Sequence, residues 1–241
     1  MGRLVFGLAA LCMGVASLSL QQQLISEWQL PGAAIFNDVT AVAQMAGGVA
    51  ILLRRWAPLG ATILAAVYAV FAMTFVPDIF GQPLQYYTWG DVCYALAPII
   101  GAVLVAGLVA RPSSTKLYRA AIIVFGVCNI SYAIEQYEFM ARTVSLVPKW
   151  VPPNGLFWAW LTAFAFALAG ISLIAGYRAV LASRLLASML WFCGVAIWIP
   201  ALVVDRKTLS NWSEGIETFM IGAVAWIVAD YLAKRKAAAR R

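Results

Sequence analysis

Histidine is absent from this chain of 241 residues. Haem b, copper and most catalytic metal centres use imidazole ligands, so a histidine-ligated haem is excluded and no metal site is predicted. Catalysis by a Ser-His or Cys-His pair is excluded as well. The sequence also lacks H-E-x-x-H, G-x-S-x-G and Gly-rich phosphate motifs, which argues against a hydrolase or a nucleotide-driven enzyme.

Charged residues are scarce. They make up 11% of the chain, against 63% hydrophobic residues, whereas a soluble domain is about a quarter charged. The mean hydropathy of +0.86 points the same way. Eight stretches are long and apolar enough to cross a bilayer. They cover residues 4–20, 34–53, 57–76, 92–110, 117–134, 156–176, 180–199 and 216–232. We therefore expect an all-α membrane protein with no room for a soluble domain.

Cysteine adds no obvious chemistry. All four cysteines fall inside these predicted spans, and none belongs to a C-x-x-C pair: they are Cys12, Cys93, Cys128 and Cys193. A disulfide in an outer loop is therefore not expected.

The basic residues are distributed unevenly. With the N-terminus inside, 13 of the 17 lysines and arginines fall on the inner side, and only Arg142, Lys149, Arg206 and Lys207 fall outside. This positive-inside bias predicts that both termini are cytoplasmic. We expect the net charge of +7, and the basic tail at 234–241 in particular, to face the anionic lipid bilayer rather than nucleic acid.

The chain contains an internal repeat. Seven residues recur 122 or 123 positions later, the last with Asp replaced by Glu. The first copies are Trp28, Pro31, Gly48, Arg55, Pro77, Trp89 and Asp91. The second copies are Trp150, Pro153, Gly170, Arg178, Pro200, Trp212 and Glu214. Because Trp and Pro are rare and substitute poorly, the match indicates a duplicated unit, and such a repeat decides the fold.

Each unit contains four spans. Residues 1–111 form the first unit, 112–116 a cytoplasmic linker, 117–233 the second unit and 234–241 the tail. An even number of spans gives both units the same orientation, so we expect eight transmembrane helices as two pseudo-symmetric four-helix bundles in parallel orientation. The first 20 residues could also be read as a signal peptide. Removing them would leave the first unit one helix short, which favours a retained span.

The outer loops carry the repeated aromatic residues. Trp28, Trp89, Trp150 and Trp212 are predicted to anchor the chain at the outer membrane interface, or alternatively to cover a cavity that opens outward. Pro77 and Pro200 are expected to end the spans that contain them.

Ionisable residues near membrane spans are candidates for function, because their burial in hydrocarbon is costly. Glu135 and Glu138 lie on one face near the outer end of the fifth span, with Asn129 and Gln136 close by. They could form a ligand or proton site, or emerge into water and be solvated. The matching region of the first unit, at 19–23, is polar but uncharged.

Asp91 and Glu214 occupy equivalent positions, two residues after a tryptophan. A carboxylate at a helix N-terminus meets free N–H groups and the positive end of the dipole. We interpret both residues as helix caps, and keep a role in a ligand or proton site as the alternative.

The second half resembles the DoxX family. Residues 147–153 read V-P-K-W-V-P-P, and residues 156–158 read L-F-W, followed by a helix, Arg178 and an apolar span up to Pro200. The resemblance covers 117–232 and reaches the first half through the repeat. Family members commonly carry a histidine in the outer part of their first helix, where this chain has Glu135-Gln-Tyr-Glu138.

The resemblance implies a multi-pass protein of the bacterial inner membrane. Some members of that family are linked to redox complexes, including thiosulfate:quinone oxidoreductase. The first hypothesis is therefore an accessory or anchoring subunit of a redox assembly, with membrane or periplasmic redox proteins as partners and quinone as a candidate ligand. The second is a carrier or binding protein for a small apolar molecule, held in a cavity between the repeats. An autonomous enzyme, with Glu135 and Glu138 as acid and base, comes third.

Overall fold

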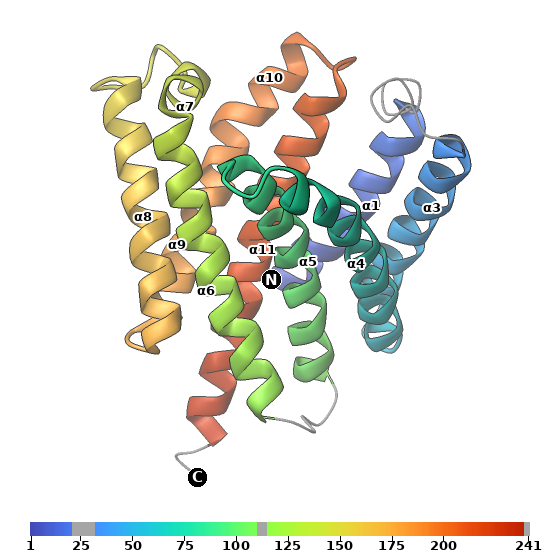
Figure 1. Cartoon of the computed structure of the whole chain (residues 1–241). Coiled ribbons are helices and arrows are strands. Elements are labelled where there is room, and N and C mark those ends of the chain that lie inside the picture. Colours follow the sequence, from blue (N-terminus) through green and yellow to red (C-terminus); the bar gives the residue numbers. More distant parts are fainter. Residues whose placement is uncertain (21–31, 110–114, 239–241) are drawn as a thin grey trace.

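The computed structural model describes residues 1–20, 32–109 and 115–238 (Figure 1). Its elements are α1 (Gly2–Ser19), α3 (Ala33–Leu52), α4 (Ala57–Gly81), α5 (Tyr86–Val109), α6 (Thr115–Glu138), α7 (Met140–Leu146), α8 (Gly155–Ala175), α9 (Ala179–Cys193), η1 (Gly194–Trp198), α10 (Ile199–Val204) and α11 (Leu209–Ala238). The anchors at Trp28 and Pro31 and most of the linker, including Pro112, lie outside the described residues.

Eight helical stretches in the described part are long and apolar enough to cross a membrane. The seventh runs from Ala179 to Val204 and joins α9, η1 and α10. Large apolar side chains cover the outside of the structure, among them Ile35, which is 71% exposed, and Leu168, which is 66% exposed. So much apolar surface is unstable in water and suits lipid contact. The prediction of an all-α, multi-pass membrane protein is confirmed.

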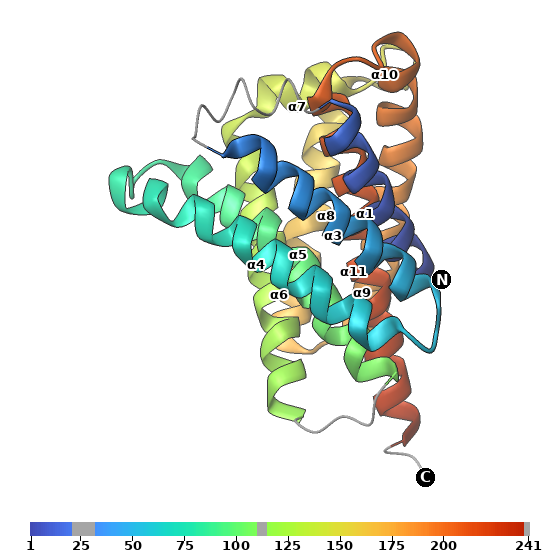
Figure 2. The ribbon, with the colours of Figure 1, turned by 90° about the vertical axis from the view of Figure 1, so that its right-hand side faces the viewer.

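The helices pack in chain order and then across the two halves. Within the halves α1 packs on α3, α3 on α4, α4 on α5, α6 on α8, α8 on α9, and α9 on α11. Between the halves α1 packs on α11, and α5 packs on both α6 and α11. Figure 1 shows α5 and α11 in the middle, with α1, α3 and α4 on one side and α6, α8 and α9 on the other. Figure 2 shows α3 and α4 inclined to α6 and α11.

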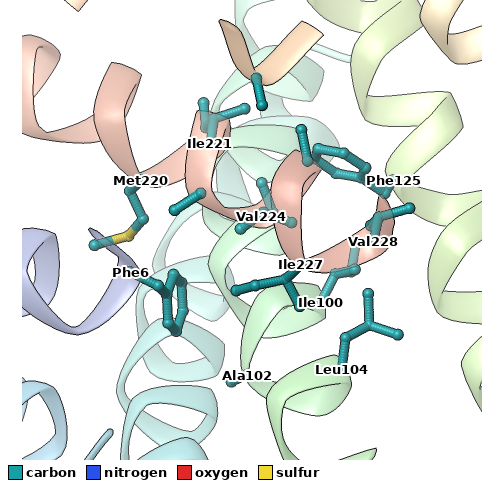
Figure 3. Close-up of a cluster of buried hydrophobic side chains, with 14 of the residues drawn as sticks. Phe6, Ile100, Ala102, Leu104, Phe125, Met220, Ile221, Val224, Ile227 and Val228 are labelled. Atoms are coloured by element: carbon teal, nitrogen blue, oxygen red, sulfur yellow. The ribbon is translucent and has the colours of Figure 1, made fainter. Parts of the chain in front are cut away.

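One hydrophobic core joins the two halves (Figure 3). Phe6 of α1, Leu104 of α5 and Phe125 of α6 surround Val224 and Ile227 of α11, and all five side chains are fully buried. Since lipid is as apolar as these side chains, close packing rather than exclusion from water holds the helices together. The two halves therefore share one hydrophobic core.

Basic side chains bind carbonyl groups at the C-terminal ends of two helices, α3 and α5. Arg3 donates to the Ile51 carbonyl at 3.2 Å, and Lys234 donates to the Leu108 carbonyl at 3.0 Å. The last carbonyls of a helix have no partner within the helix, so cations are favourable there.

Neither proline ends its helix, contrary to the sequence-based expectation. α4 continues past Pro77 to Gly81. Pro200 lies at the start of α10, directly after the π-helical turn that joins α9 to α10. In that turn the Ile199 N–H bonds to the Gly194 carbonyl, five residues earlier. The wider turn accommodates the proline and keeps the span continuous.

Candidate functional site

A large cavity lies between the two halves. It has a volume of about 680 Å³, within the range of small-molecule sites. Each of the eight membrane-spanning helices contributes to its wall, and so does α7. The wall is mostly apolar, with aromatic side chains from α3 and α4 that include Phe36, Phe71 and Phe75. Phe36 and Phe71 meet edge to face, with ring centroids 6.0 Å apart.

Four carboxylates line this cavity: Asp91 from α5, Glu135 from α6, and Glu214 and Glu217 from α11. Glu214 and Glu217 are three residues apart, so they share one face of α11. Arg142 of α7 forms a salt bridge of 2.6 Å with Glu214. Within the part of the chain that the structure describes, the other three carboxylates form no salt bridge.

The cavity wall also holds buried polar atoms with no hydrogen-bond partner. They are Gln44 Oε1 on α3, the Tyr68 hydroxyl on α4 and Glu135 Oε2 on α6. Gln44 is 2% exposed and Tyr68 is 7% exposed. Buried polar groups without partners are rare and costly, and they need an explanation such as a bound molecule.

Other polar side chains in the wall are bonded to one another. The Thr162 hydroxyl of α8 donates to Gln136 Oε1 at 2.9 Å, and the Tyr94 hydroxyl donates to the Glu135 carboxylate. The rings of Tyr94 and Tyr132 lie 4.7 Å apart. These contacts link α5, α6 and α8, and so hold the Glu135 side of the cavity in place.

The structure brings together four of the candidate residues that the sequence singled out: Asp91, Glu135, Gln136 and Glu214 all line the cavity. Glu138 is exposed and does not line it, so Glu135 and Glu138 do not face one site. Asn129 is fully buried outside the cavity wall, and its side-chain N–H donates to the Phe125 carbonyl at 2.7 Å.

The capping interpretation of Asp91 and Glu214 is wrong. α5 begins at Tyr86 and α11 at Leu209, so each acid is the sixth residue of its helix rather than a cap. Both helices begin earlier than the apolar pattern indicated, because their first turns are made of polar and aromatic residues. The carboxylates therefore lie one turn or more inside the helices, where they reach the cavity.

The outer tryptophans have a structural role that the sequence did not indicate. The Trp89 indole N–H donates to the Pro83 carbonyl at 3.0 Å, and the Trp212 indole N–H donates to the Arg206 carbonyl at 2.9 Å. Each bond ties the first turn of a helix to the loop before it. Trp150 is 72% exposed, as an interface residue would be. None of these three lines the cavity, and Trp28 falls outside the described residues.

Sequence reasoning missed Gln44, Tyr68 and Glu217. Glu217 had a signal, because it is an acid inside an apolar span and three residues from Glu214. Gln44 and Tyr68 had none that distinguished them from ordinary polar residues within a helix. They belong to the site only because α3 and α4 pack around the same space.

Searches against protein-family models, curated proteins and solved structures found no match to this chain. The site is therefore interpreted from its own geometry.

Proposed function

We propose that this protein binds a small, largely apolar molecule in the cavity between its two halves, and acts as a carrier or binding protein in the membrane. One observation carries the proposal: a cavity of about 680 Å³ whose wall contains unpaired, buried polar atoms. An apolar wall with a few inward polar groups is the usual form of a small-molecule site.

The positions of the helices support this choice. Membrane helices normally close their interior with small residues and direct contacts, as α5 and α11 do near Gly101 and Val224. Closer to α7 and η1, the same two helices do not close the interior. There Asp91, Glu214 and Glu217 line the cavity. Polar residues inside a membrane protein are expensive, and they mark sites and pathways.

The membrane arrangement that we propose follows the sequence. Two DoxX-like four-helix units run parallel in a bacterial inner membrane, with both termini in the cytoplasm. In that orientation the cavity lies towards the outer leaflet. An insertion test with a reporter fused at each terminus distinguishes this topology from its inverse.

A redox assembly is the second candidate, with this chain as an accessory or anchoring subunit and quinone as the occupant of the cavity. The Tyr68 hydroxyl favours it, because an unpaired donor in an apolar wall can bind a quinone carbonyl. Extraction of a stoichiometric quinone, or co-purification of a redox partner, supports this candidate. Purification of the chain alone, without quinone, counts against it.

The test of the binding function is purification from native membranes into nanodiscs, followed by solvent extraction and mass spectrometry. Ala196 lines the cavity from η1, so Ala196→Phe fills part of it. Ala69, on the exposed face of α4, does not line the cavity, so Ala69→Phe is the matched control. We expect one compound to accompany the wild type and Ala69→Phe but not Ala196→Phe. Equal recovery from all three, or from none, contradicts the proposal.

A further inference from the structure

The unpaired atoms on the cavity wall share one property, which is that each can accept a hydrogen bond. Gln44 Oε1 and Glu135 Oε2 are acceptors, and the Tyr68 hydroxyl accepts as well as donates. Gln44 and Tyr68 are more than nine-tenths buried, so water from outside the protein does not reach their side chains freely. An occupant that satisfies all three atoms must therefore supply hydrogen-bond donors.

The wall also carries an excess of negative groups. Of its four carboxylates, Glu214 is paired with Arg142, which is the one basic residue among the described lining residues. Glu217 lies within electrostatic range of Glu135 and Asp91. A carboxyl group taken out of water either takes up a proton or is stabilised as a carboxylate by a counter-charge. A positively charged occupant supplies that counter-charge, and a neutral or an anionic one does not.

A bare metal ion does not fit this arrangement. A cation such as Ca²⁺ or Mg²⁺ needs several oxygens within about 2.6 Å of one point. In the part of the chain that the structure describes, no three acidic or thiol side chains converge in that way. The carboxylates instead spread around a cavity whose remaining wall is apolar and aromatic, including Phe71 and Phe75. Such a space suits a cation that has an organic body, and the aromatic faces favour its charge.

We infer that the occupant is an organic ammonium ion, meaning a protonated amine on a compact apolar body. Its three N–H groups bond to Glu135 Oε2, Gln44 Oε1 and the Tyr68 hydroxyl, which are the three unpaired atoms on the cavity wall. Glu217 adds negative charge within electrostatic range of Glu135 and Tyr68. Its apolar body lies against Phe36, Phe71 and Phe75. This inference rests on the proposed function, because it names the class of molecule that the same cavity takes.

The test compares two probes that differ in one group. 4-Phenylbutylamine is protonated at neutral pH, and 4-phenylbutan-1-ol has the same body without the charge. Each is titrated calorimetrically into the full-length protein in nanodiscs, with empty nanodiscs as the blank for partition into lipid. We expect the amine to bind about tenfold more tightly or better, as a charged hydrogen bond provides.

Two variants locate the effect. Glu217→Gln should weaken amine binding by about tenfold and leave the affinity for the alcohol unchanged. Glu138→Gln, an exposed acid outside the cavity, should change neither. Equal affinity for amine and alcohol in the wild type overturns the ammonium inference but leaves the binding function standing. Binding of neither probe overturns both.

Discussion

Gly48 of α3 and Gly170 of α8 stand 122 positions apart and face the same kind of neighbour. A Cβ atom added to Gly48 would lie 2.6 Å from the Gly7 carbonyl oxygen of α1, and one added to Gly170 would lie 2.6 Å from the Gly126 carbonyl oxygen of α6. The α1–α3 and α6–α8 crossings are therefore alike at these two repeated glycines. At both crossings the backbones approach more closely than any side chain allows.

This contact predicts the effect of added methyl groups. Gly48→Ala and Gly170→Ala should each lower the free energy of unfolding by about 1–3 kcal/mol, because backbone must move to make room. Gly81 at the end of α4 has open space around its Cβ position, so Gly81→Ala should not destabilise the protein. The unfolding midpoints of the wild type and the three variants, measured in detergent, check this prediction. Equal midpoints for all of them would show that the helices do not cross at these glycines.

The loop hydrogen bonds of the tryptophans predict a second pair of effects. Trp89→Phe and Trp212→Phe remove the indole donors to the Pro83 and Arg206 carbonyls. Each loop should lose about 0.5–1.5 kcal/mol of local stability, seen as faster amide exchange in its own turn. Trp150→Phe is the control, since its side chain is 72% exposed. An unchanged exchange rate in both loops would mean that the tryptophans serve only as interface anchors.

The contact between α5 and α6 across the two halves can be tested by cross-linking. The thiols of Cys93 and Cys128 lie within hydrogen-bonding range of each other, and the Tyr132 hydroxyl donates to the Cys93 carbonyl at 2.9 Å. A membrane-permeant oxidant such as diamide should join Cys93 to Cys128 within one chain. Peptide mapping should find no bond between Cys12 and Cys193. The Cys128→Ser variant, which cannot form this bond, is the blank. If the wild type does not form the Cys93–Cys128 bond either, this packing is contradicted.

The loop before α11 should respond to acid. The Thr208 hydroxyl, at 2.5 Å, and the Lys207 N–H, at 3.0 Å, donate to the Asp205 carboxylate and hold the pKa of Asp205 below its ordinary value. Because the pKa is lowered in the folded state, this contribution to stability is complete above the ordinary aspartate pKa. It is lost as the pH falls through the lowered value.

Amide exchange at Lys207 should therefore quicken on acidification into that range, after correction for the intrinsic rate. Asp205→Asn should remove the pH dependence. The first half provides a natural control, because Gln82 stands where the second half has Asp205 and does not titrate. Parallel behaviour of the two loops would contradict the assignment to Asp205.

The sequence predicted the eight spans because apolar stretches of that length have few other uses. It placed the starts of α5 and α11 too late, since the carboxylates of Asp91 and Glu214 lower the local hydropathy while the backbone is already helical. It also treated Pro200 as a stop, because a π-helical turn that accommodates a proline has no mark in the sequence.

The site was predictable only in part. Asp91, Glu135 and Glu214 stood out because acids near membrane spans are costly, but the sequence did not indicate that they share one cavity. That depends on how α5, α6 and α11 pack, which contacts between distant parts of the chain decide. Gln44 and Tyr68 became visible only through their buried atoms without partners.

The most direct test of the central claim is an experimental structure of the wild-type protein in nanodiscs, prepared from native membranes. Electron cryomicroscopy with a bound antibody fragment suits a chain of 26.1 kDa. We predict non-protein density in the cavity, in contact with Gln44, Tyr68 and Glu217. An interior closed by direct packing of α3 and α4 against α6 and α11 would contradict the account.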